Sequence, residues 1–180
     1  RRRRIARLSK AEQRYYALAL ALAGSPRLLV LDDPTLGLDA VARRKLYEEI
    51  VGELADRGTT VFLTTHDLTG VEGIADTVGI LQKGSLLVDE KIEALKARFC
   101  RLTWNESDEY PLVQVERALR HLGSVRTRKA AGAFQTVVDN FSETGFGLFR
   151  EEAPVEVVRV DSLSLEEIFI ILCGEQGIVP

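Results

Sequence analysis

The stretch LLVLDDPTLGLD, residues 28–39, decides the fold class of this chain. Its apolar run ends in two adjacent carboxylates, Asp32 and Asp33, followed by a proline and a glycine turn. A short continuous apolar run of this kind is typical of a parallel strand covered on both faces. Two like charges at its end repel each other, and neither is buried cheaply without a cation or a hydrogen-bond donor. The tip is therefore either exposed to solvent or the place of a bound positive charge.

The first half of the chain alternates between helix and strand patterns. Helices are predicted at 9–24, 40–58, 68–76 and 91–99, strands at 27–32 and 59–67, and a strand–turn–strand at 77–90. Ser9, with Glu12 three residues on, predicts a capping box at the start of the first helix. The alternation indicates an α/β fold, a parallel sheet with helices on its faces, whose ligands bind beyond the carboxyl ends of the strands. Asp32, Asp33 and His66 all fall at that edge.

The pattern changes after residue 97. The last part of the chain has strand patterns at 99–109, 133–141 and 154–160 and helix patterns at 110–123, 142–153 and 164–175. Ser164 and Glu167 predict a second capping box. We therefore expect two domains, residues 1–97 and a small α+β module at residues 98–180.

The composition is that of an ordinary soluble globular chain, with 180 residues, 46% hydrophobic, 28% charged and a net charge of −3. No apolar run approaches the roughly 20 residues of a membrane span, and the near-neutral charge argues against nucleic-acid binding. Cys100 and Cys173 are interpreted as reduced thiols of a cytosolic protein. The opening run RRRR, residues 1–4, is interpreted as a solvated segment; the alternative is a patch for nucleic acid or anionic lipid.

Four ordered segments carry a resemblance to a known family: LSKAEQ at 8–13, LLVLDDP at 28–34, LGLD at 36–39 and TTHD at 64–67. In this order they resemble the signature motif, the Walker B strand, the D-loop and the switch histidine of an ATP-binding-cassette (ABC) transporter ATPase. The resemblance runs from about Leu8 to Lys96. It implies the C-terminal part of a P-loop NTPase-like parallel sheet. The tail ending SLEEIFIILCGE resembles the C-terminal extension of some exporter-type ABC ATPases.

The resemblance implies roles for the two carboxylates. Asp32 matches the aspartate that holds Mg²⁺, usually through water, because this cation keeps much of its hydration and prefers carboxylate oxygen. Asp33 stands where active members usually have a glutamate that polarises the attacking water. It keeps the charge but is one methylene shorter, and a misplacement of about 1 Å can cost on the order of 10²-fold in rate. We therefore expect a slow ATPase; the alternative is a solvated strand end.

The resemblance also implies roles for two residues in turns. His66 matches the histidine that contacts the γ-phosphate and helps organise the site; the alternative is a solvent-facing residue that caps a helix. Asp39 matches the D-loop aspartate at the dimer interface, and it equally suits the N-cap of the following helix. The second histidine, His121, lies near the end of an amphipathic helix, where it favours the helix dipole, and we assign it no function.

The signature segment departs most from the family form, LSGGQ, whose serine and backbone N–H groups bind the γ-phosphate of ATP held by the opposing subunit. Ser9 is kept, Lys10 replaces the first glycine, and Glu12 replaces the glutamine. Ala11 replaces the second glycine, where its methyl group could obstruct the close approach of phosphate. The alternative is that these residues only cap a helix.

No GxxxxGKS/T phosphate loop occurs in these 180 residues. In the family this loop and its lysine, the Q-loop glutamine and the aromatic that stacks on adenine all belong upstream of Leu8. The chain contains no Met and opens inside a charged segment, so we expect it to be a fragment. By itself it should bind nucleotide poorly and hydrolyse none.

The resemblance implies the ATP-binding and hydrolysing subunit of an ABC transporter that couples ATP, with Mg²⁺, to export across a membrane. It implies a homo- or heterodimer of such subunits, a separate transmembrane permease subunit and no nucleic acid. It also implies a cytoplasmic place on the inner face of the cell membrane.

Two alternatives to this function stay open. The chain could be a degenerate, non-catalytic ABC module that acts as a regulatory or dimerisation partner, which Lys10, Ala11 and Asp33 favour. It could also be a soluble ABC protein that works on nucleic acid or ribosomes. The absence of long basic linkers and of a tandem cassette argues against that last class.

Overall fold

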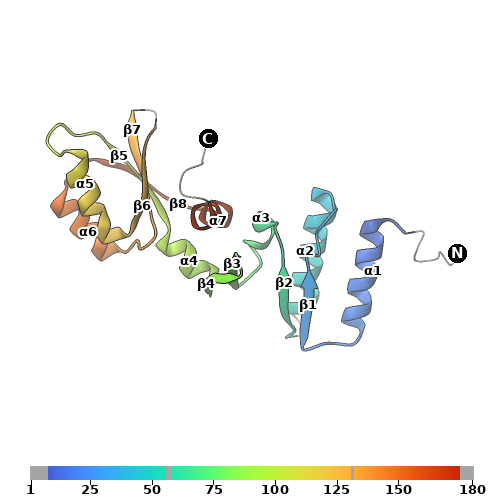
Figure 1. Cartoon of the computed structure of the whole chain (residues 1–180). Coiled ribbons are helices and arrows are strands. Elements are labelled where there is room, and N and C mark those ends of the chain that lie inside the picture. The colour runs from blue at the N-terminus through green and yellow to red at the C-terminus, as the bar shows by residue number, and fades with distance from the viewer. Residues whose placement is uncertain (1–7, 56–57, 131, 175–180) are drawn as a thin grey trace. The chain divides into compact units, whose positions relative to one another are not determined.

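The computed structural model describes residues 8–55, 58–130 and 132–174 (Figure 1). The chain divides into two compact units, Arg1–Ile74 and Ala75–Pro180. The sequence-based boundary after residue 97 marks where the family resemblance ends; it falls inside the second unit and stays a prediction. The run RRRR lies outside the described residues. Within the described ranges, no helix combines the length and the apolar character that crossing a membrane requires.

The first unit contains a pair of parallel strands and the helices that flank it. Its described elements are α1 (Lys10–Ala23), β1 (Leu28–Asp32), α2 (Ala40–Ala55), β2 (Thr60–Thr64) and α3 (Leu68–Val71). β1 and β2 pair in parallel, with Leu28 opposite Thr60 and Asp32 opposite Thr64. The predicted α/β arrangement with parallel pairing is confirmed. The carboxyl ends of both strands therefore meet at one edge of the sheet, as Figure 1 shows.

α1 begins where the sequence predicts. The hydroxyl of Ser9 accepts the backbone N–H of Glu12, and the Glu12 carboxylate accepts the backbone N–H of Ser9 in return. This capping box satisfies N–H groups at the helix start that have no intrahelical partner. The helix ends at Gly24, and Pro26 follows before β1.

One face of the two-stranded sheet is covered, and the other is open. Leu29 of β1 is buried, as are apolar residues of the helices and of the turn after β1, namely Leu18, Leu38, Leu46 and Ile50. Val30 and its cross-strand partner Phe62 are 63% and 60% exposed. The expectation of a strand covered on both faces is therefore wrong for the described structure. Successive side chains of a strand point to opposite faces, and the described part of this unit covers one of them.

The second unit opens with a β-hairpin. β3 (Thr77–Gln82) and β4 (Ser85–Lys91) pair antiparallel, and Lys83 and Gly84 connect them with φ angles of 49° and 82°. Two central residues with positive φ are characteristic of the type I′ turn, whose twist matches the flanking strands. The predicted strand–turn–strand is confirmed, and α4 (Ile92–Arg98) follows it.

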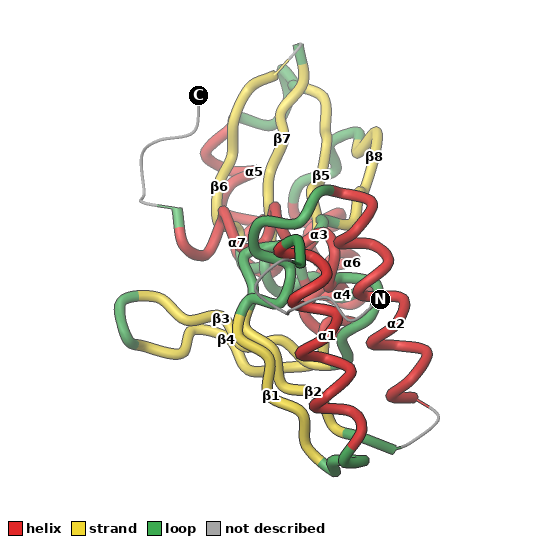
Figure 2. The backbone as a smooth tube through the Cα atoms, turned by 90° about the vertical axis from the view of Figure 1, so that its right-hand side faces the viewer, coloured by secondary structure: helices red, strands yellow, loops and turns green. Residues whose placement is uncertain are grey.

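The remainder of the second unit has the element order β–α–β–β–α–β. Its elements are β5 (Cys100–Asn105), α5 (Leu112–Ala118) with the 3₁₀ turn η2 (Leu119–Leu122), β6 (Ser124–Ala130), β7 (Ala133–Val138), α6 (Glu143–Glu152), β8 (Val157–Ser162) and a final helix α7 (Leu165–Cys173). Figure 2 shows the four strands side by side in the antiparallel order β6-β7-β5-β8. This is the ferredoxin-like arrangement. The predicted α+β class of this region is therefore confirmed.

An aromatic pair forms the centre of the core of this α+β region. The ring of Trp104 stacks on that of Phe134 with centroids 4.5 Å apart, and its Nε1 donates to the Thr136 hydroxyl at 3.1 Å. Cys100 lies in the same core and Cys173 in α7, and both are free thiols in the described structure; the interpretation of a cytosolic protein stays a prediction. Burial raises the pKa of both thiols, which favours their protonated form.

Candidate functional site

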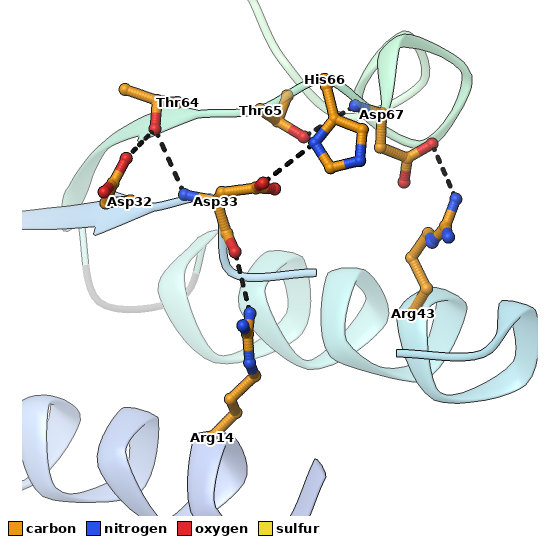
Figure 3. A network of polar contacts seen from close by, with 8 residues as sticks. All are labelled: Arg14, Asp32, Asp33, Arg43, Thr64, Thr65, His66 and Asp67. Carbon is orange, nitrogen blue, oxygen red and sulfur yellow. Dashed lines mark hydrogen bonds and ion pairs between the residues drawn. The ribbon is translucent and has the colours of Figure 1, made fainter. Parts of the chain in front are cut away.

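The two strand tips of the first unit form the centre of the candidate site. The backbone N–H of Asp33, which follows β1, donates to the carbonyl oxygen of Thr64 at 2.9 Å and lies 3.2 Å from the hydroxyl oxygen of the same residue (Figure 3). The Thr64 hydroxyl donates in turn to a carboxylate oxygen of Asp32. The end of β2 therefore holds both aspartates at the sheet edge where the sequence predicts them.

Thr64 was not among the predicted site residues. The parallel register, which places the last residue of β2 opposite Asp32, is the signal that could have found it. The Thr64 hydroxyl donates to the Asp32 carboxylate. The carbonyl and hydroxyl oxygens of Thr64 both accept from the backbone N–H of Asp33. Thr64 therefore contacts both of the adjacent aspartates.

Asp33 and His66 form a direct pair. Nδ1 of His66 lies 2.9 Å from Oδ2 of Asp33, and the two side chains are 69% and 24% exposed. The second carboxylate oxygen of Asp33, Oδ1, is buried and has no hydrogen-bond partner among the described residues. A buried carboxylate oxygen normally accepts a hydrogen bond from protein or water. In the described structure this oxygen is an unsatisfied buried acceptor, which a water or a ligand donor would reach only after the surrounding groups move.

The backbone of Asp33 is held in an unusual conformation. Its φ is +40°, a left-handed value that few residues other than glycine adopt, although aspartate and asparagine tolerate it better than most. Its carbonyl oxygen accepts from Nη1 of Arg14 in α1 at 2.8 Å and from the N–H of Leu36 at 3.1 Å. Contacts from three segments of the first unit therefore fix this peptide.

Asp67 ties the turn of His66 to α2. Its carboxylate lies 3.3 Å from Nη1 of Arg43, is 8% exposed, and also accepts the N–H of Gly70 at the start of α3. Its own N–H donates to the hydroxyl of Thr65 at 2.9 Å. These contacts, drawn in part in Figure 3, hold the backbone on either side of His66.

Gly70 leaves no room for a side chain behind this turn. A Cβ there would lie 2.4 Å from Oδ2 of Asp67 and 2.4 Å from Cε2 of Tyr47. Tyr47 is 4% exposed, and burial raises the pKa of its phenol above the ordinary 10.0, so that it stays neutral. The tight packing fixes Asp67, and with it the residue before it.

The predicted signature residues lie at the start of α1. Ser9 and Glu12 are joined by the capping box, so the N–H groups that would face an anion already have a carboxylate of the same chain beside them. The side chains of Lys10 and Ala11 lie outside the described part, although their backbones belong to α1. The helix start is thus built as a cap, and the binding role of these four residues stays a prediction.

Asp39 caps α2, as its residue type suggests. Its Oδ1 accepts the N–H of Ala42 at 2.8 Å and its carbonyl accepts the N–H of Arg43 at 2.9 Å. The structure therefore brings Asp32, Asp33 and His66 together around Thr64, whereas Ser9 and Asp39 each sit at the start of a helix. His121 of the second unit pairs with Glu152 at 3.0 Å.

The donors at the strand tip fit Mg²⁺. Among the residues that the structure describes, no group of three or more His, Cys, Asp and Glu side chains could hold a metal ion. Mg²⁺ usually takes one or two carboxylates and completes its shell with water and substrate phosphates. Asp32, an exposed carboxylate at a strand end with the Thr64 hydroxyl on one oxygen, fits that mode.

Comparison with known proteins finds relatives that are named as ATP-binding proteins of transport or export systems. A family model described as an AAA domain, with the AbiEii toxin and Type IV TA system in its description, matches residues 1–71. The ABC transporter ATP-binding protein YtrB of Bacillus subtilis is 29% identical over 167 residues, which are 93% of this chain and 55% of YtrB. The fluoroquinolones export ATP-binding protein Rv2688c of Mycobacterium tuberculosis is 30% identical over 176 residues, which are 96% of this chain and 52% of that protein.

A solved structure gives a further similarity. An ABC transporter of the metal-chelate type in an inward-facing conformation matches with a TM-score of 0.44 and 22% identity, over 79% of this chain and 52% of that chain. This chain spans about half the length of YtrB and Rv2688c.

Proposed function

We propose, from the premise that this chain is homologous to the ATP-binding proteins of ABC transporters, that the intact protein hydrolyses ATP as such a subunit. The chain matches about half of the length of these relatives. The activity, substrate and partners of the whole protein are therefore stated as parts of this proposal. The observation that carries it is the pair of Asp33 and His66 beside Asp32 at the tips of two parallel strands.

Each of these three residues has a part in the proposed reaction. The Asp33 carboxylate accepts a hydrogen bond from the attacking water and so orients it toward the γ-phosphorus. His66 approaches Asp33 through Nδ1, which leaves Nε2 for a γ-phosphate oxygen. Asp32 holds Mg²⁺, which neutralises charge on the phosphate oxygens when bound.

The remaining partners follow from the same family. The subunit acts as a homo- or heterodimer in which the start of α1, with Ser9, Lys10, Ala11 and Glu12, faces ATP of the opposing subunit, and Asp39 lies at the interface. A separate permease subunit spans the membrane, no nucleic acid takes part, and the protein works at the cytoplasmic face. The name of the relative Rv2688c, a fluoroquinolones export protein, supports export as the direction.

Steady-state ATP hydrolysis by the full-length protein tests the proposal. We expect slow turnover, because Asp33 is one methylene shorter than the family's glutamate, and loss of turnover in Asp33→Asn, which keeps the shape and removes the charge. Asp33→Glu tests whether the added reach outweighs the strain at φ +40°. A turnover that survives Asp33→Asn at the wild-type rate would reject the role of this carboxylate.

A second candidate function is a non-catalytic partner of an active homologue. The observation that favours it is the Glu12 carboxylate on the N–H of Ser9, since a negative side chain at this helix start opposes a phosphate there. A full-length protein that is inactive, is not rescued by Asp33→Glu, and yet stimulates a second ATP-binding subunit would establish this reading.

A further inference from the structure

A single side chain links helix α1 to the backbone of Asp33. Arg14, 19 residues earlier in the chain, points from α1 toward the strand tip, and its Nη1 donates to the carbonyl oxygen of Asp33 at 2.8 Å (Figure 3). Its guanidinium group is part-buried in this contact. A hydrogen bond from a charged donor is roughly twice as strong as one between neutral groups. This contact is therefore a strong local restraint on one peptide group.

The restraint acts on a residue whose backbone is strained. A φ of +40° is strained for a residue with a side chain and persists only where surrounding contacts over-determine it. The N–H of Asp33 is fixed by Thr64 and its carbonyl by Arg14 and Leu36. The direction of the Cα–Cβ bond follows from φ and from the orientation of these two peptides. The position of the Asp33 carboxylate relative to His66 therefore depends on the Arg14 contact.

We propose that Arg14 is a positioning residue, which fixes the Asp33 peptide so that the carboxylate meets Nδ1 of His66. The inference rests on the proposed ATP hydrolysis and adds a residue to that site. Arg14 touches no reacting atom in this role; it acts through the Asp33 carbonyl alone. Its hydrogen bond also connects α1, the helix capped by Ser9, to the backbone of the residue whose carboxylate serves the proposed reaction.

Arginine suits this task better than lysine or glutamine. Its guanidinium stays charged at any physiological pH and presents its donors in a rigid plane, whereas a lysine ammonium is a mobile point charge. Glutamine keeps a donor but is shorter and neutral. We therefore expect Arg14→Gln to release the peptide and Arg14→Lys to preserve part of the restraint.

The test uses the full-length protein with variants Arg14→Gln and Arg14→Lys. The matched control is Arg44→Gln, an arginine of α2 that is 83% exposed and pairs only with Glu48 in the described contacts. In Arg14→Gln we expect kcat for ATP hydrolysis to fall about 10- to 100-fold, because the carboxylate loses its place by a fraction of an ångström to about 1 Å. KM for ATP should change less than kcat, and Arg14→Lys should lie between. The control should match the wild type.

A second measurement reports the position of the Asp33 carboxylate relative to His66 and does not depend on ATP hydrolysis. The ¹⁵N resonances of the His66 ring, in ¹⁵N-histidine-labelled protein and assigned with His66→Gln, report the hydrogen bond at Nδ1. We expect them to shift in Arg14→Gln and to stay unchanged in Arg44→Gln. A purely structural role of Arg14 would lower the unfolding temperature and leave the kcat-to-KM pattern and these resonances at wild-type values.

The outcomes separate the two proposals. If the wild type hydrolyses no ATP, the proposed function fails, and the His66 resonances alone decide the role of Arg14. If those resonances are the same in wild type, Arg14→Gln and Arg14→Lys, the inference is overturned, whatever the activity. Should Arg14→Gln fail to fold, Arg14→Lys decides: resonances and kcat equal to those of the wild type in a folded Arg14→Lys overturn the inference.

Discussion

The Asp33 carboxylate lies 2.9 Å from Nδ1 of His66, although 33 residues separate them in the chain. The contact exists because β1 and β2 run in parallel and end at the same sheet edge, with Asp32 opposite Thr64. The turn after each strand then carries one member of the pair. The parallel register of two short strands therefore brings this pair together.

The left-handed backbone of Asp33 predicts an order of stability among variants that lack the carboxylate. Asp33→Gly should be more stable than Asp33→Ala by about 1 kcal/mol, since alanine pays for φ +40° and glycine does not. Urea unfolding followed by circular dichroism checks this. Equal stabilities would mean that the peptide relaxes to a negative φ once the carboxylate is gone.

Gly70 predicts a steric effect on the turn of His66. Gly70→Ala places a methyl group 2.4 Å from both Asp67 and Tyr47, so we expect a loss of about 1–3 kcal/mol in the free energy of unfolding. Gly73→Ala is the matched control, because a Cβ at that glycine meets nothing within 4 Å. A Gly70→Ala protein as stable as the control would show that α3 moves aside without cost.

Glu12 predicts a charge effect at the start of α1. In Glu12→Gln the amide oxygen can still accept from Ser9, but the negative charge beside the helix start is gone. We expect KM for ATP in the full-length protein to fall about two- to five-fold, in line with a helix-terminus charge effect of about 0.3–1 kcal/mol. Glu166→Gln, in the first turn of α7, is the control and should leave KM unchanged.

Glu167 predicts a pH dependence of stability in the second unit. Hydrogen bonding to Ser164, together with Arg101, holds the pKa of Glu167 below its ordinary 4.5. A lowered pKa contributes stability above the unfolded value and loses it as the pH falls through the folded value. The stability difference between wild type and Glu167→Gln should therefore be present at pH 7 and should shrink as the pH falls below about 4.5.

The size of this effect is limited by exposure. The Glu167 side chain is 41% exposed, so solvent screens its pair with Arg101 and the difference should be about 1 kcal/mol or less. Urea titrations at several pH values measure it, with Glu166→Gln beside Glu167→Gln as the control. A difference that stays constant from pH 7 to pH 3 would contradict the linkage.

Local signals in the sequence predicted most of the elements. The spacing of Ser9 with Glu12 and of Ser164 with Glu167 gave both capping boxes, and both are present. The strand β6 was missed, because SVRTRKA carries three cations and reads as a loop. It forms the edge of its sheet, where one neighbour suffices and charged side chains reach solvent.

Three residues of the candidate site were singled out from the sequence, whereas Thr64 and the contacts that hold the site were missed; the roles of these residues stay predictions. Motif order pointed to Asp32, Asp33 and His66, but no pattern in the sequence indicates that Arg14 bonds the Asp33 carbonyl. Nor does it indicate the positive φ of Asp33, which depends on contacts from β2 and α1 together. Contacts between elements that are far apart in the chain have no local signature.

The single tryptophan of the chain makes one unit visible by itself. Trp104 is 1% exposed and stacked on Phe134 in the second unit, and the first unit carries none. In this chain the indole emission therefore reports the folding and packing of the ferredoxin-like region alone. A change in that emission in a variant of Asp33 or Arg14 would therefore show that a substitution in the first unit alters the surroundings of Trp104 in the second.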